Sequence, residues 1–79
     1  MLKYRAVLSD PGNLNPERPV QTFANSMAEI ERWAYGEEKG GMERARGVLP
    51  GAVSDQAMVK VYLVSETQMA MLTKKGKDL

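Results

Sequence analysis

The chain contains neither cysteine nor histidine, so its fold has to be held by packed side chains and backbone hydrogen bonds alone. Small domains often compensate for a small core with disulfide bridges or zinc knuckles, and both are excluded here. A chain of 79 residues lies near the lower limit of what folds without such support. We therefore expect a single domain over residues 1–79, with a marginal core that a homodimer would help to stabilise.

The same absence bears on function, because His and Cys side chains carry out much of the chemistry that small proteins perform. A catalyst without them depends on carboxylates, lysines, tyrosines or hydroxyls that are strongly perturbed in a buried pocket. Glu37 and Glu38 are adjacent, so their side chains diverge and do not form a paired site for a metal or a sugar. We predict a non-enzymatic protein that acts by binding, with no cofactor and no metal.

Charge and hydropathy narrow the class of partner. Eleven Lys or Arg face ten Asp or Glu, which gives a net charge of +1. A duplex-DNA binder of this size is usually far more basic, and a DNA mimic far more acidic. Lys3 and Arg5 interrupt the apolar residues at the N-terminus, so no transmembrane or secretory segment is expected. We predict a cytoplasmic protein in a host cell.

Apolar and polar residues alternate over residues 2–8, which is typical of a strand with one buried face. The inward positions are Leu2, Tyr4, Ala6 and Leu8. A turn at 10–13 and a proline-rich loop follow. Residues 20–23 then fit a short second strand that pairs with the first.

A helix is predicted from Ser26, because Ser26 and Glu29 have the spacing of a capping box. Apolar residues share one helical face, namely Phe23, Met27, Ile30 and Ala34. The helix is expected to end near Gly36 or to run on to Gly40-Gly41. Residues 42–46 are expected to add one further helical turn.

The C-terminal third contains a second clear strand over residues 58–64. Both of its faces are substantially apolar, which favours a central strand or one covered by a partner. Residues 66–75 have two interpretations: a capping-box pattern at Ser65 and a Lys-Lys-Gly end favour a helix, whereas the alternation of Met69, Met71 and Thr73 fits a returning strand. We favour the helix. The expected fold is therefore α+β, a small antiparallel sheet packed on one main helix, with a second, C-terminal helix.

Aromatic and basic side chains in the predicted helix are candidates for partner contacts. Arg32, Trp33 and Tyr35 are of the residue types that most often dominate interface energy. Core packing is the competing role, favoured for Trp33 and evenly weighted for Tyr35.

Two basic patches are candidates for phosphate contacts. Lys39, Arg44 and Arg46 form one patch in a glycine-flanked loop, and Lys74, Lys75 and Lys77 form another near the C-terminus. The near-zero net charge favours the ordinary interpretation, in which both are solvated surface.

The predicted helix resembles the central helix of small anti-CRISPR proteins encoded by phages. The resemblance is carried by Phe23-x-x-Ser26-x-x-Glu29-Ile30-Glu31-x-Trp33-x-Tyr35-Gly36, followed by glycines. The family member in question inhibits a type I-F surveillance complex and is similar in length and α+β class. The resemblance implies a phage protein that docks on a CRISPR effector subunit and blocks hybridisation of target DNA. Because the sheet carries the contacts in that inhibitor, Tyr4 and Tyr62 are the implied analogues.

The leading prediction is a non-enzymatic phage or mobile-element protein that docks on and inhibits a host macromolecular complex, most specifically a type I CRISPR effector. Its predicted contacts are Tyr4, Arg32, Trp33, Tyr35 and Tyr62. The alternative is a small nucleic-acid-binding accessory protein that uses the two basic patches. A third hypothesis is a structural module whose sheet completes an oligomer.

Overall fold

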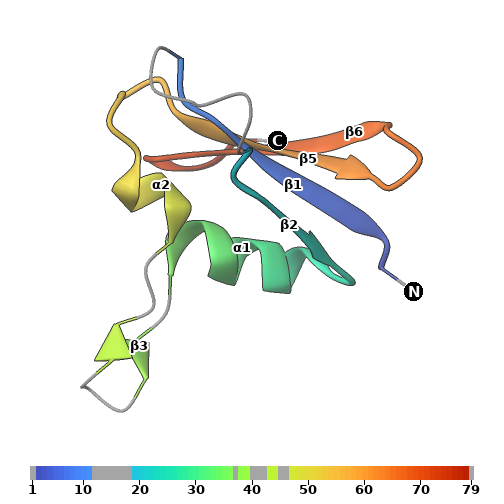
Figure 1. Cartoon of the computed structure of the whole chain (residues 1–79), viewed down its shortest axis with the longest axis horizontal. Coiled ribbons are helices and arrows are strands. Elements are labelled where there is room, and N and C mark those ends of the chain that lie inside the picture. Colours follow the sequence, from blue (N-terminus) through green and yellow to red (C-terminus); the bar gives the residue numbers. More distant parts are fainter. Residues whose placement is uncertain (1, 12–18, 37, 40–42, 45–46, 79) are drawn as a thin grey trace.

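The computed structural model describes residues 2–11, 19–36, 38–39, 43–44 and 47–78. In chain order its elements are β1 (Tyr4–Ser9), β2 (Gln21–Ala24), α1 (Met27–Tyr35), β3 (Glu38–Lys39), β4 (Glu43–Arg44), α2 (Val48–Gly51), β5 (Met58–Leu63), β6 (Gln68–Thr73) and β7 (Gly76–Asp78). They form two layers, with a sheet on one side and the helices on the other (Figure 1).

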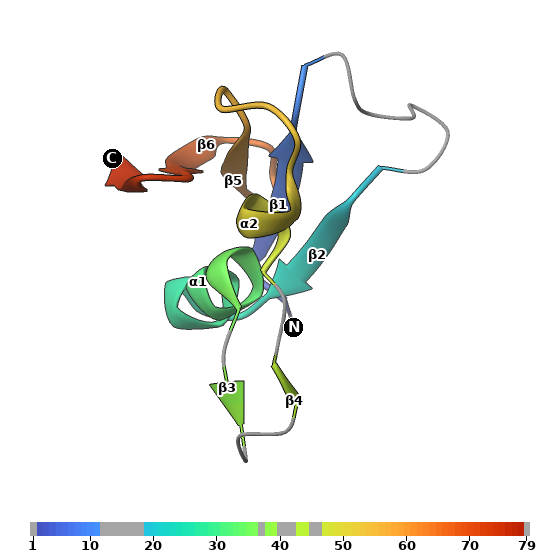
Figure 2. The ribbon, with the colours of Figure 1, turned by 90° about the vertical axis from the view of Figure 1, so that its left-hand side faces the viewer.

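A five-stranded antiparallel sheet has the strand order β2-β1-β5-β6-β7. Both helices lie on the same side of it (Figure 1, Figure 2), and β3 and β4 form a separate two-stranded hairpin that projects away from it. The predicted α+β class, with an antiparallel sheet and one main helix, is confirmed. The second predicted strand also pairs with the first, as β2 with β1. Central placement of β5 accounts for its two apolar faces, and the homodimer stays a prediction.

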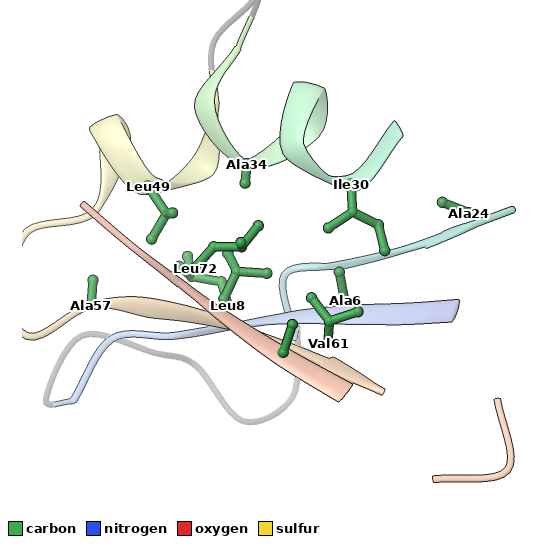
Figure 3. Packing of buried hydrophobic residues seen from close by; sticks show 11 residues of the cluster. Ala6, Leu8, Ala24, Ile30, Ala34, Leu49, Ala57, Val61 and Leu72 are labelled. Atoms are coloured by element: carbon green, nitrogen blue, oxygen red, sulfur yellow. The ribbon is translucent and has the colours of Figure 1, made fainter. Parts of the chain in front are cut away.

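The hydrophobic core lies between the sheet and the helices (Figure 3). Its buried side chains are Ala6, Leu8, Ala24, Val59, Val61, Ala70 and Leu72 from strands, Ile30, Ala34 and Leu49 from helices, and Ala57 from a loop. The alternation predicted for residues 2–8 is confirmed within β1, although Leu2, before the strand, is 46% exposed. Full burial of one aliphatic side chain stabilises a fold by about 1.5–3 kcal/mol. Ile30, Leu49 and Leu72 are therefore major contributors to stability.

The start of α1 follows the predicted capping box with one difference. The Ser26 hydroxyl oxygen accepts a hydrogen bond from the Glu29 backbone N–H at 3.3 Å. The Glu29 carboxylate in turn accepts from the backbone N–H of Asn25, at 2.9 Å, rather than from that of Ser26. The side chain still satisfies a backbone donor just before the first turn, which is how such caps stabilise a helix.

The end of α1 is fixed by two glycines. Gly36 has a φ of 82°, which favours glycine, and its N–H donates to the Arg32 carbonyl oxygen at 2.8 Å. The helix therefore ends at Tyr35, which agrees with the first of the two predicted ends. Gly47 lies against this helix end so closely that an added Cβ would overlap the backbone of Tyr35 and Gly36. Any side chain at position 47 would force the backbone at the end of α1 or the start of α2 to shift.

The favoured C-terminal helix is wrong, because residues 68–73 form strand β6. A turn reverses the chain after β5: the Leu63 N–H donates to the Thr67 carbonyl at 2.8 Å and the Glu66 N–H to the Leu63 carbonyl at 2.7 Å. Glu66 has a φ of 79°, which belongs to a turn and not to the first turn of a helix. A strand here places both Ala70 and Leu72 in the core and pairs the free edge of β5.

Two further expectations for the middle of the chain are corrected. Phe23 does not share the apolar face of α1, because it lies in β2 and is 45% exposed. Met27, Ile30 and Ala34 do pack toward the core, as predicted. Where residues 42–46 were expected to form a helical turn, β4 pairs with β3 as a strand, and the rest of that segment lies outside the described residues.

A buried carboxylate fixes the loop between α2 and β5. Asp10 is 3% exposed and is the buried polar side chain of the described residues. Its two carboxylate oxygens accept hydrogen bonds from the backbone N–H groups of Val53, at 2.8 Å, and Ser54, at 3.1 Å. The end of β1 is thereby attached to a loop more than forty positions along the chain, which positions α2 over the sheet.

Candidate binding surface on the open face of the sheet

The sheet has one face that no described helix covers (Figure 1, Figure 2). Strand residues alternate between faces, so those that do not face α1 and α2 share this second face. We call this set the open face: Ser9, Val7 and Arg5 of β1; Gln21 and Phe23 of β2; Met58, Lys60 and Tyr62 of β5; Gln68, Met69, Met71 and Thr73 of β6. It is richer in aromatic, methionine and cationic side chains than the core face.

One row of the open face runs across three neighbouring strands. Arg5 is the register partner of Phe23 on one side and of Tyr62 on the other. The Arg5 guanidinium carbon lies 5.1 Å from the centroid of the Tyr62 ring, a cation–π contact. Because neighbouring strands are about 4.8 Å apart, the three Cα atoms span roughly 10 Å. The row therefore presents two rings with a planar cation between them.

A second row lies next to the first. Val7 is the register partner of Gln21 and of Lys60, and Lys60 pairs in turn with Met71. Lys60 thus precedes Tyr62 by two residues in β5 and lies on the same face of the sheet. A β-bulge between Val61 and Tyr62 shifts the pairing with β6 at the edge of this row, which increases the local twist of the sheet.

Charge is distributed unevenly between the two sides of the molecule. The sequences of β1, β2, β5 and β6 contain Arg5 and Lys60 and no Asp or Glu. The acidic residues Glu29 and Glu31 lie in α1, on the other side of the sheet. Asp78, in β7, is the register partner of Met71 and bounds the open face at one edge. Apart from Asp78 at this edge, the charged residues of the open face are therefore Arg5 and Lys60.

The residues predicted to contact a partner do not gather in one site. Tyr62 lies on the open face, whereas Tyr4 packs against the core on the helix side. In α1, Arg32 is exposed, and Trp33 and Tyr35 are partly buried against the core. The Tyr35 hydroxyl also donates to the Thr73 carbonyl at 2.9 Å, which attaches the helix end to β6. Only Tyr62 of the five shares a face with Phe23 and Arg5.

The predicted basic patches are placed differently from one another. Lys39 and Arg44 lie in the β3–β4 hairpin, where their register partners are Glu43 and Glu38, and Arg46 lies outside the described residues. In the second patch, the Lys74 ammonium donates to the Ala52 carbonyl at 2.6 Å, Lys75 is exposed, and Lys77 is in β7 opposite Leu72. Lys74 therefore has a role in holding the loop after α2.

Arg5 and Phe23 are the members of the central row that sequence reasoning missed as site residues. The spacing of Phe23 from Met27 fits a helical face, and this interpretation does not lead to the pairing of Phe23 with Arg5. A signal was present in the sequence: residues 20–23 had already been predicted to form a strand paired with the first. In an antiparallel pair, alternate residues of two strands share a face, so an exposed Phe–Arg pair follows from the correct register.

A shallow hollow lies at the end of β1 and β5. It has a volume of about 350 Å³ and is lined by Leu2, Lys3, Leu63, Val64 and Ser65. Val64 is 52% exposed and donates its N–H to the Lys3 carbonyl at 2.9 Å. The two segments of the chain therefore stay hydrogen-bonded to each other just beyond the ends of β1 and β5. The exposed apolar surface of the sheet thus extends to this end.

Two observations concern the described part of the chain. No three His, Cys, Asp or Glu side chains lie close enough together there to hold a metal ion. No helix in the same residues is long and apolar enough to cross a membrane.

No protein-family model matches the sequence, and comparison with curated proteins and with solved structures gave no match.

Proposed function

We propose that this protein is a non-enzymatic binding protein that docks on a larger macromolecular complex through the open face and thereby inhibits that complex. The observation that supports it is the row of Phe23, Arg5 and Tyr62 on a sheet face that no described helix covers. Aromatic side chains and Arg are the types that contribute most to binding energy when they become buried at the centre of an interface.

The position of this row within the sheet supports docking further. Arg5 and Tyr62 lie in β1 and β5, which are interior strands with neighbours on both sides. Their backbones are fixed by the register of three antiparallel pairs, so little conformational entropy is lost when a partner binds. The cation–π contact holds the Arg5 side chain over the Tyr62 ring in the same way.

The specific complex that we propose as the target is a type I CRISPR effector, with a phage or mobile element as the source of the protein. This part rests on the resemblance of residues 23–36 to an anti-CRISPR helix. In the structure that segment spans the end of β2 and all of α1. Inhibition would follow from occupancy: a protein seated on the effector prevents target DNA from reaching the guide.

Binding of a purified type I effector to the immobilised protein tests the proposal. Wild-type protein is expected to bind and to reduce hybridisation of target DNA by the effector. Replacing both rings, by Phe23→Ala with Tyr62→Ala, is expected to weaken binding at least about 30-fold, the equivalent of one strong hot spot. Val53→Ser is the matched control, because Val53 is 76% exposed and lies in the loop before β5, away from the open face.

Three results would count against this function. Unchanged affinity of the double variant would show that the open face is not the docking surface. Absence of any binding to type I effectors would remove the proposed target. Turnover of a substrate that one carboxylate or lysine substitution abolishes would contradict the non-enzymatic part.

A further inference from the structure

We infer that the open face binds single-stranded nucleic acid, with bases stacking on the Phe23 ring and on the Arg5 guanidinium that lies over Tyr62, and with Lys60 contacting a phosphate. The inference rests on the proposed docking function and deepens it, because it names the chemistry that the open face recognises. The proposed target hybridises DNA, so a surface that holds an unpaired strand is compatible with it.

The aromatic side chains supply the stacking surface. Proteins that hold unpaired strands present rings on an exposed sheet or groove, and every base can stack on them because every base has a π-face. Phe23 is 45% exposed, and Tyr62 lies two strands away in the same row. The Arg5 guanidinium between them is itself a planar surface on which a base can stack.

The charges of the open face favour an anionic occupant. Neither Arg5 nor Lys60 has an ion-pair partner among the described side chains, and β1, β2, β5 and β6 contain no carboxylate. The carboxylate residue of the sheet is Asp78, in edge strand β7 opposite Met71. The glutamates of α1 lie on the far side of the sheet. Two cations interleaved with two rings form the pattern of a single-strand site, a pattern that the basic patches of the hairpin and the C-terminus lack.

The size of the open face favours a narrow ligand over a broad protein surface. Four strands of about six residues cover roughly 14 Å by 20 Å, from spacings of about 4.8 Å between strands and 3.3 Å along them. Even if side-chain relief doubles that area, it stays near 600 Å², below the roughly 800 Å² that each partner buries in a standard protein interface. An extended strand of a few nucleotides fits such a strip. Duplex DNA is a poorer fit, because two cations neutralise few of its phosphates.

Fluorescence anisotropy with labelled oligouridylate and oligothymidylate of about 12 nucleotides, long enough for one site, tests the inference. The duplex of the same length is the comparison ligand. Wild-type protein is expected to bind the single strands more tightly than the duplex, and affinity is expected to fall as salt is raised. Phe23→Leu is expected to weaken binding about 5- to 100-fold, the loss of one stacked base.

Conservative variants separate stacking from mere apolar contact. Phe23→Tyr keeps a ring and is expected to bind like the wild type, whereas Phe23→Leu keeps only apolar bulk. Lys60→Gln is expected to reduce the slope of log affinity against log salt by about 0.7, and Lys60→Arg to leave it unchanged. Val53→Ser serves as the control for exposed apolar surface, and circular dichroism verifies that each variant is folded.

Three results of the oligonucleotide assay would overturn the inference: no binding of either oligonucleotide, equal binding of the duplex, or wild-type affinity in Phe23→Leu. Binding of the type I effector, measured separately, tests the proposed docking function independently of oligonucleotide binding. If oligonucleotides do not bind and the double ring variant still loses the effector, the open face is a protein-docking surface. If a ring substitution only dissociates a homodimer, seen by sedimentation, the occupant is a second copy and the nucleic-acid site is rejected.

Discussion

The two faces of the sheet are made by neighbouring residues of the same strands, yet they have different compositions. Leu72 is fully buried against the helices, whereas its neighbour Met71 lies on the open face. The core face of the strands consists largely of Ala, Val and Leu, and the open face includes two cations, two aromatic rings and three methionines. Residues that provide stability and residues available for binding therefore alternate along the chain, which allows each set to be changed without the other.

The largest effect is expected from adjacent substitutions in β6. Leu72→Ala is expected to lower the free energy of unfolding by about 2–5 kcal/mol, because it leaves a cavity in the core. Met71→Ala, on the open face, is expected to cost less than about 1 kcal/mol. Urea denaturation followed by circular dichroism measures both. If Leu72→Ala does not fold, Ile30→Val replaces it, with an expected cost of about 0.5–1.5 kcal/mol. Equal losses of stability at positions 71 and 72 would show that the two faces of the sheet do not differ in their contribution to folding.

A smaller effect is expected where the helix layer fits closely. Gly47→Ala forces a Cβ onto the backbone at the end of α1, and we expect a loss of about 1–3 kcal/mol, typical of overpacking. Gly51→Ala is the matched control, since nothing lies within 4 Å of its added Cβ. Thermal unfolding compares the two variants. Similar melting temperatures would mean that the close approach of the chain at Gly47 is not needed.

The smallest effect is expected from the hydroxyls of two tyrosines on opposite sides of the sheet. Tyr35→Phe removes the hydrogen bond to the Thr73 carbonyl and should cost about 0.5–1.5 kcal/mol. Tyr62→Phe keeps the ring over which Arg5 lies, and its stability should stay within about 0.5 kcal/mol of the wild type. Chemical denaturation of both proteins gives the difference. A larger loss for Tyr62→Phe would show that the open face contributes to folding through that hydroxyl.

Local patterns predicted several elements well. The alternation in residues 2–8 and the capping box at Ser26 each depend on a few neighbouring residues. The first is confirmed within β1, and the second is confirmed for the Ser26 hydroxyl, while the Glu29 carboxylate accepts from Asn25 instead of Ser26. The same kind of pattern failed at Ser65, where a capping-box sequence lies in the turn between β5 and β6. Capping residues are also common turn residues. The choice between the two was made by the need to bury Ala70 and Leu72 and to pair the edge of β5.

The sequence by itself determined which residues alternate, where α1 begins, and that no disulfide stabilises the fold, because these depend on residue type and spacing along the chain. Only the tertiary structure decided which face of each strand the helices cover. The sequence marks both Tyr4 and Tyr62 as strand residues with aromatic rings, but packing of α1 and α2 placed one in the core layer and left the other on the open face. The Phe23–Arg5–Tyr62 row exists only because antiparallel register brings together three strands that are distant in sequence.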